Sequence, residues 1–70
     1  MRGSTTTASL TARERCIVEL IDQGLTNREI ATQLCIEVST VKNHVHNVLE
    51  KLNVHRRSQA AAILRTASQR

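Results

Sequence analysis

Apolar residues recur at three- or four-residue intervals in four stretches of the chain, which is the spacing of one face of an α-helix. The clearest stretch covers about residues 38–52, where five apolar side chains form one stripe: Val41, Val45, Val48, Leu49 and Leu52. Two earlier stretches begin at Thr11 and Thr26, and a last one covers about residues 56–68. The pattern therefore predicts four helices.

Local signals mark where these helices start and stop. Two sequences have the form of a capping box, in which a Thr and a Glu side chain each bond a free backbone amide at a helix start: Thr11-x-x-Glu14 and Thr26-x-x-Glu29. Gly24 and Asn53 tolerate the left-handed conformation that closes a helix. We expect them to end the first and third helices.

The second and third predicted helices make a characteristic pair. A short capped helix is followed by a tight turn and by a helix with one apolar edge and one polar, donor-rich edge. Ala31, on the core side of the shorter helix, is small enough to let the two helices cross closely. Two short helices arranged in this way form the helix-turn-helix, whose second helix reads DNA in the major groove.

Composition agrees with a small all-α domain. The 70 residues include no Phe, Tyr, Trp or Pro, and 40% are hydrophobic, so the core must be aliphatic. Such a core suits a four-helix bundle better than a sheet. The net charge of +4 favours a polyanionic partner, although on charge alone a solvated basic surface without a ligand is an equal alternative. No Ser-His-Asp arrangement, carboxylate pair or phosphate-binding Gly loop is evident, so we do not expect an enzyme.

The cysteines and histidines give no sign of a cofactor. Cys16 and Cys35 fall within predicted helices and lack Cys-x-x-Cys spacing, so we expect buried, reduced thiols and a cytoplasmic protein. His44 and His46 are two positions apart on a helix and point about 200° away from each other, so they cannot chelate one ion. We expect no metal, and no stretch approaches the ~18 apolar residues of a membrane span.

The chain divides into a tail and one domain. Residues 1–9 are polar, rich in Thr and Ser and without periodicity, which predicts a disordered tail or linker. The start Met1-Arg2-Gly3-Ser4 is also consistent with a vector-derived sequence, in which case the rest is a fragment of a longer protein. We assign residues 10–70 to a single domain.

Several short motifs together resemble a known family. In chain order they are Leu10-Thr11-x-Arg13-Glu14, Gly24-Leu25-Thr26-Asn27-Arg28-Glu29-Ile30-Ala31, Leu34-x-Ile36, Thr40-Val41-Lys42-x-His44 and Lys51-Leu52-x-Val54-x-x-Arg57. Their order and spacing are similar to the LuxR/FixJ-type, GerE-like DNA-binding domain of quorum-sensing regulators and response regulators. The resemblance covers about residues 10–64. It implies a bacterial transcription regulator that binds double-stranded DNA sequence-specifically, with the third helix in the major groove.

The resemblance also implies roles for individual residues. The positions that approach bases or nearby backbone are matched by Lys42, Asn43 and His46. The positions near phosphates are matched by Thr26, Asn27, Thr40 and His44. The residue chemistry agrees, because Asn can bond adenine through two hydrogen bonds, Lys can reach guanine or phosphate, and Thr hydroxyls suit phosphate oxygens. The alternative for each is an ordinary solvated or packed side chain.

Partners follow from the same resemblance. The fourth helix commonly supplies a homodimer contact, and its expected face comprises Ala60, Ile63, Leu64 and Ala67. Packing of that face onto the core is the alternative. Arg57 matches a recurrent Arg for which we expect a structural pairing with Glu14. An N-terminal receiver or ligand-binding domain absent from this chain is a further expected partner. A helical protein-interaction module that does not bind DNA on its own is the competing function.

Three positions depart from the family pattern. Glu37 stands where the family usually has a Ser or Thr cap before the third helix, and its carboxylate would favour the helix dipole but repel phosphate, or accept from a cytosine amino group. Asn53 stands where Gly is frequent. His55 and Arg56 replace small hydroxyl residues, so we expect an irregular start to the fourth helix.

Overall fold

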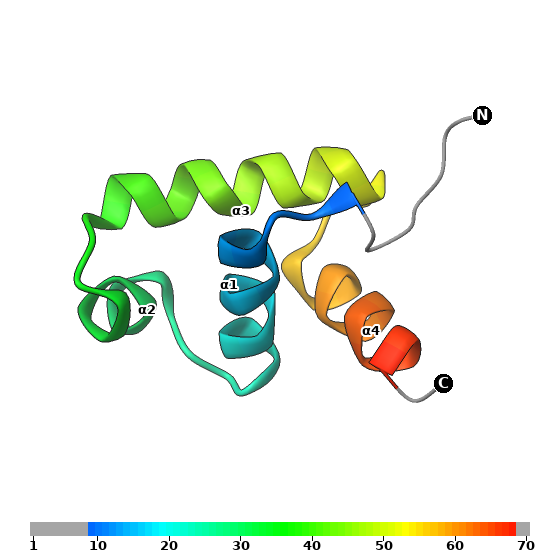
Figure 1. Cartoon of the computed structure of the whole chain (residues 1–70), viewed down its shortest axis with the longest axis horizontal. Helices are drawn as coiled ribbons and strands as arrows, with labels where there is room; N and C mark the ends of the chain where they lie inside the picture. The colour runs from blue at the N-terminus through cyan, green and yellow to red at the C-terminus, as the bar shows by residue number, and fades with distance from the viewer. Residues whose placement is uncertain (1–8, 69–70) are drawn as a thin grey trace.

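The computed structural model describes residues 9–68 as four α-helices joined by short connections (Figure 1). They are α1 (Ala12–Asp22), α2 (Asn27–Leu34), α3 (Val38–Leu52) and α4 (Arg57–Ser68). α3 runs along one side of the molecule, with α2 near its N-terminal end, α1 near its middle and α4 toward its C-terminal end. The prediction of an all-α domain containing a helix-turn-helix is confirmed. Most of the predicted tail, residues 1–8, lies outside the described residues.

Both predicted capping boxes are present. At the start of α1 the Thr11 hydroxyl accepts from the Glu14 amide at 3.1 Å, and the Glu14 carboxylate accepts from the Thr11 amide at 2.9 Å. The same pair of bonds at the start of α2 joins Thr26 and Glu29, at 3.2 and 2.8 Å. Each box satisfies backbone amides that a helix start leaves without partners, so the two helices begin where the sequence predicts.

Three helices end with one and the same device, a left-handed residue followed by an amide that bonds the carbonyl five residues back. The left-handed residues are Gly24, Cys35 and Asn53, with φ of 94°, 59° and 58°. The bonds that follow them are Leu25 to Leu20, Ile36 to Ala31 and Val54 to Leu49, at 3.1, 3.0 and 3.0 Å. This 6→1 bond satisfies a terminal carbonyl and turns the chain sharply. The predicted roles of Gly24 and Asn53 are confirmed.

Cys35 corrects one expectation. It was predicted to lie within a helix as a buried thiol, but it follows the last residue of α2 and is exposed. The reason is the left-handed backbone at this position, which ends the helix at Leu34 and removes the side chain from the apolar stripe. Cys16 is half-buried on α1, and both cysteines are free thiols.

The core consists of two aliphatic clusters that share α1 and α3. The first lies toward α4 and contains Leu10, Val18, Val48, Leu52, Ala60 and Leu64. The second lies toward α2 and contains Ile17, Leu20, Ile30, Ala31, Val41 and Val45. The single stripe of α3 therefore packs against α2 through its first half and against α4 through its second half. Leu49, between the two, contacts both clusters.

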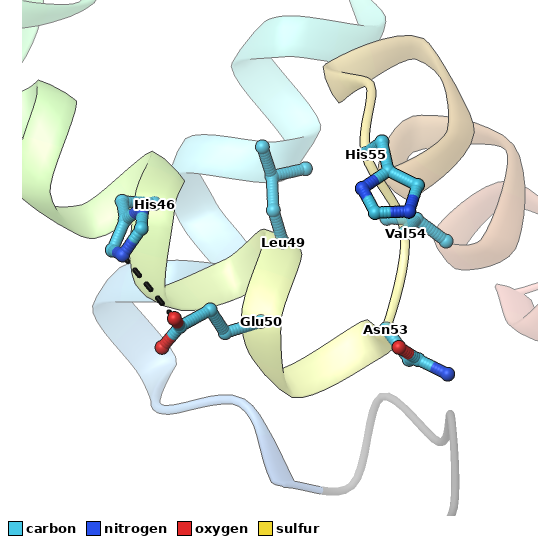
Figure 2. A pocket seen from close by; sticks show the side chains of 6 residues that line it. All are labelled: His46, Leu49, Glu50, Asn53, Val54 and His55. Carbon is cyan, nitrogen blue, oxygen red and sulfur yellow. Dashed lines mark ion pairs between the residues drawn. The ribbon is translucent and has the colours of Figure 1, made fainter.

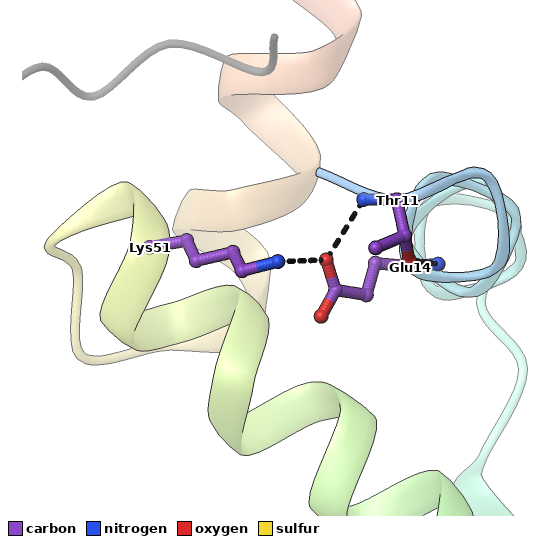
Figure 3. A network of polar contacts seen from close by, with 3 residues as sticks. All are labelled: Thr11, Glu14 and Lys51. Carbon is purple, nitrogen blue, oxygen red and sulfur yellow. Dashed lines mark hydrogen bonds and ion pairs between the residues drawn. The ribbon is translucent and has the colours of Figure 1, made fainter. Parts of the chain in front are cut away.

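An ion pair joins α1 to the C-terminal half of α3 (Figure 3). Glu14 is only 4% exposed, and its Oε1 accepts from the Lys51 Nζ at 2.7 Å as well as from the Thr11 amide. Burial by itself raises the pKa of Glu14, but the hydrogen bonds from Lys51 and Thr11 and the Lys51 charge together hold this pKa below its ordinary value. The carboxylate is therefore ionised, and it ties the start of α1 to α3.

The start of α4 is better defined than the sequence suggested. The helix begins at Arg57, one residue later than expected. The Gln59 Oε1 accepts from the backbone amides of His55 and Arg56, at 3.1 and 2.9 Å. A side chain inside the first turn thus holds the two backbone amides that directly precede the helix, and the expected irregular start is wrong.

We expect Lys51→Met to lower the free energy of unfolding by about 2 kcal/mol, because it leaves the Glu14 carboxylate buried without its counter-charge. The value lies below that of a fully buried pair because the Lys51 side chain is 35% exposed. Urea denaturation of both proteins measures the difference. Arg65→Met is the matched control, since it breaks the more exposed Asp22–Arg65 pair and should cost much less. Equal losses in the two variants would contradict a special role for Glu14.

The lowered pKa of Glu14 also predicts a pH dependence. A carboxylate whose folded pKa is lowered contributes stability above its unfolded pKa, about 4.3 for Glu, and loses this contribution as the pH falls through the folded value. We therefore expect the stability difference between the wild type and Glu14→Gln to be largest near pH 7 and to shrink by pH 3. Denaturation curves at the two pH values test this, and a difference that grows on acidification would refute it.

Candidate nucleic-acid interface

The side of α3 that faces away from the core is polar and open to solvent. Lys42, Asn43 and His46 are exposed on it, whereas Val41 and Val45 are buried on the opposite side. Within residues 9–68 the side chains of Lys42 and Asn43 make no hydrogen bond or ion pair, so their donors and acceptors are available to a ligand. All three residues predicted to contact bases lie together on this one helix face.

His46 has an acidic neighbour on its own helix. Its Nε2 lies 3.3 Å from the Glu50 carboxylate one turn further along α3, and both side chains are 70% exposed (Figure 2). The two residues border a shallow depression of about 520 Å³ together with Leu49, Asn53, Val54 and His55. Because both side chains are largely exposed, the contact between His46 and Glu50 is weak and leaves His46 accessible to a ligand.

The four residues predicted to contact phosphates lie on the two helices of the helix-turn-helix. Thr40 and His44 are half-buried on α3 and have no side-chain partner within residues 9–68. Thr26 caps α2, and its hydroxyl oxygen accepts from the Glu29 amide, which leaves the hydroxyl proton free to donate. Asn27 is half-buried at the first position of α2, where its Oδ1 accepts from Arg57.

The contacts of Arg57 correct a second expectation. Its predicted partner, Glu14, is bound to Lys51 instead. The Arg57 guanidinium reaches from the start of α4 to the Leu25 carbonyl, at 3.2 Å, and to the Asn27 Oδ1. Arg57 and Asn27 are 30 positions apart in the sequence, and no local sequence pattern predicts a contact between them. Its role is structural as expected, but it holds α4 to α2 and not to α1.

Arg28 is a candidate that the sequence analysis missed. It is exposed in the first turn of α2, next to Asn27, and within residues 9–68 it has no ion-pair partner. A positive charge at a helix start opposes the helix dipole and becomes favourable when an anion lies nearby. The signal was present in the sequence, as a basic residue directly after a predicted phosphate contact.

Glu37 leaves the start of α3 without a side-chain cap. It occupies the N-cap position and is exposed, but its carboxylate makes no capping hydrogen bond. Its carbonyl accepts the first helical bond, from the Val41 amide at 3.1 Å. The amides of the first turn of α3 are thus uncapped, at the end of the helix that adjoins α2.

The predicted dimer face of α4 divides into buried and exposed residues. Ala60 and Leu64 are buried in the core cluster next to α1 and α3, and only Ile63 and Ala67 among the four predicted residues have surface to offer. Ile63 itself packs partly against the same cluster. Most of this face therefore packs against the core of the domain, which is the alternative to a dimer contact.

Comparison with known proteins identifies the family. Residues 8–64 match the model of the luxR family of bacterial regulatory proteins, described as GerE. The match covers four-fifths of the chain and includes all of α1, α2 and α3. The chain belongs to the luxR family.

Two relatives of this luxR-family chain differ in length. Spore germination protein GerE of Bacillus subtilis is 49% identical over 55 residues, which are 79% of the chain and 74% of GerE. The transcriptional regulatory protein LiaR of the same organism is 53% identical over 53 residues, 76% of the chain but 25% of LiaR. The chain thus spans about a quarter of the longer relatives. Among solved structures, the response regulator ChrA superposes with a TM-score of 0.80 at 38% identity, over 86% of the chain and 30% of ChrA.

The described part of this luxR-family chain adds two observations. None of its helices is long and apolar enough to cross a lipid bilayer. Residues 9–68 also bring no three His, Cys, Asp or Glu side chains together in a group suited to a metal ion. The family is one of regulatory proteins and not of enzymes.

We expect Glu37→Asp to raise the free energy of unfolding by about 0.5–1 kcal/mol, because the shorter carboxylate reaches the first-turn amides of α3 that Glu37 leaves uncapped. The substitution keeps the charge, so the helix-dipole contribution stays the same. Thermal unfolding measures the change. Glu37→Ala, which has neither a cap nor a charge, should be less stable than both, and an unchanged melting temperature in Glu37→Asp would refute the uncapped start.

Proposed function

We propose that this chain is the DNA-binding domain of a bacterial transcription regulator and that α3 enters the major groove of double-stranded DNA. The observation that supports this most strongly is the exposed face of α3, where Lys42 and Asn43 have no partner within residues 9–68. An α-helix fits the major groove, and in a helix-turn-helix the second helix is the one inserted. A relative 44% identical over 54 residues is named the DNA-binding transcriptional activator DevR/DosR of Mycobacterium tuberculosis.

The three exposed residues of α3 differ in the bases they suit. The Asn43 side chain has an amide oxygen that can accept from the adenine N6 amino group and an NH2 group that can donate to adenine N7. Lys42 carries donors only and suits guanine acceptors or a nearby phosphate. His46 offers one imidazole nitrogen to the groove while Glu50 holds the other side of the ring. We therefore expect base preference to rest mainly on Asn43.

Phosphate contacts would place the helix in the groove. Thr26, Asn27, Thr40 and His44 supply hydrogen-bond donors from α2 and α3, and Arg28 adds a positive charge beside them. Such contacts fix register and orientation but carry no base sequence. Each cation that neutralises a phosphate releases counterions, so binding should weaken steeply as salt rises. The Glu37 carboxylate would weaken binding if it lies near a phosphate, because the two negative charges repel each other. Its other possible role is to accept a hydrogen bond from a cytosine amino group.

The native regulator is proposed to be larger and to act as a pair in the cytoplasm. The chain spans about a quarter of LiaR and of NarL from Escherichia coli, which leaves room for an N-terminal receiver or ligand-binding domain. One domain of this size binds few base pairs, and two copies on paired half-sites gain affinity through effective concentration. A homodimer contact through α4 would use Ile63, Ala67 and their exposed neighbours, because Ala60 and Leu64 are buried.

Selection from a randomised duplex pool at two salt concentrations tests the proposal. Enrichment of a short motif, above all as paired half-sites, is the expected result. Loss of binding at the higher salt should accompany it. Absence of binding even at low salt would refute the proposal and would favour the helical protein-interaction module instead.

Two alanine variants should separate base reading from phosphate binding on a selected duplex. Asn43→Ala should cost about 1–3 kcal/mol on the preferred sequence and little on a scrambled one, because it removes base contacts. Lys42→Ala should weaken binding to both and flatten the salt dependence. Arg65→Ala, which removes a charge from α4, is the control for net charge. Equal losses of both α3 variants on every duplex would contradict the division of roles.

A further inference from the structure

Arg57 links the start of α4 to the start of α2, where two of the proposed phosphate contacts lie. Its guanidinium donates through Nη2 to the Leu25 carbonyl and through Nη1 to the Asn27 Oδ1. Leu25 lies in the connection between α1 and α2, and Asn27 is the first residue of α2. Arg57 is half-buried, so the bonds are partly shielded from solvent.

The chemistry of this pair fixes the orientation of the Asn27 amide. A guanidinium has donors and no acceptor, so only the carbonyl oxygen of an amide can face it. The Asn27 Oδ1 is therefore bonded to Arg57, and the Nδ2 group is the part of the amide that this bond leaves unused. The Nδ2 group has no hydrogen-bond partner within residues 9–68.

We propose that Arg57 is a positioning residue for DNA binding, which orients Asn27 so that its Nδ2 donates to a phosphate oxygen of the DNA backbone. The inference rests on the proposed function and specifies the ligand group for this residue. A phosphate oxygen only accepts, and the side of Asn27 left unpartnered only donates, so the two are complementary. Arg57 acts through Asn27 and does not itself contact the phosphate.

The same geometry explains why an unfixed Asn27 would bind less well. An amide without a fixed partner flips between two orientations of similar shape, in which its acceptor oxygen and its donor nitrogen exchange places. One of them presents its oxygen to the phosphate, and two acceptors repel each other. By holding one orientation before DNA arrives, Arg57 removes the cost of selecting it on binding.

Asn27→Asp distinguishes the two sides of the side chain. It keeps an oxygen for Arg57, with an added charge attraction, and replaces the Nδ2 donor with a second oxygen. We expect the melting temperature to stay the same or rise, while the affinity for a DNA duplex at low salt concentration falls at least tenfold. The measurement is fluorescence anisotropy with a duplex from the selected pool and with a scrambled duplex, and both should lose affinity because phosphate contacts do not depend on sequence.

A double-mutant cycle tests whether Arg57 acts through Asn27. Asn27→Ala should weaken binding about fivefold, the value of one hydrogen bond. Arg57→Met should weaken it about twofold, because only one of the two orientations of an unfixed Asn27 amide can donate to the phosphate. Arg57→Met in the Asn27→Ala background should then cost no more than Arg65→Met, which removes the same charge from α4. If the loss of affinity in the double variant equals the product of the losses in the two single variants, the inference is overturned, because Arg57 then acts independently of Asn27.

The remaining outcomes also decide the question. If Arg57→Met does not fold, Arg57→Lys takes its place in the cycle, because it keeps the positive charge but lacks the fork of donors that reaches both the Leu25 carbonyl and the Asn27 Oδ1. Asn27→Asp binding as tightly as the wild type overturns the inference and leaves DNA binding itself intact. A wild-type domain that binds no duplex at low salt refutes the proposed function, and this inference fails with it.

Discussion

The stripe of aliphatic side chains on α3 belongs to both halves of the core, and this double attachment determines which face the helix turns outward. Val41 and Val45 pack toward α2, while Val48 and Leu52 pack toward α4. Rotating α3 about its axis would withdraw valines and leucines from both clusters, at about 1.5–3 kcal/mol for each fully exposed side chain. The polar face with Lys42 and Asn43 is thus held outward by packing on the opposite side. The Glu14–Lys51 pair adds a polar fixed point near the C-terminal end of the helix.

The sequence was sufficient for the helices because each signal is local. The capping boxes at Thr11 and Thr26 lie within four residues, and the stripe of α3 repeats within fifteen. Gly24 and Asn53 could be recognised because their residue types favour left-handed backbone. Cys35 could not, because nothing in a cysteine signals that conformation; the end of α2 is imposed by the 6→1 bond and by the packing of α2 on α3. The start of α4 lies within one residue of the prediction, but its regular geometry was not foreseen, because Gln59 and not a hydroxyl residue bonds the amides at the helix start.

For the candidate site, the sequence predicted positions and the structure supplied relations between them. The outward placement of Lys42, Asn43 and His46 follows from helix periodicity alone. The partner of Arg57 does not, because Asn27 comes close only when α4 and α2 are both packed in the domain. Burial of Ala60 and Leu64 likewise depends on how α4 packs against α1 and α3, and small residues on a helix suit either a core or a second copy. Contacts between side chains on helices that are far apart in the sequence could not be predicted for this chain, because they depend on how the helices pack.

The left-handed turn after α2 gives the domain a built-in chemical handle. Cys35 faces solvent at the junction of α2 and α3, whereas Cys16 is half-buried on α1. A thiol-reactive dye should therefore label the chain first beside the proposed DNA surface, on a side chain that takes no part in the core. Fluorescence from that position would report the approach of a ligand to the helix-turn-helix without any engineered cysteine.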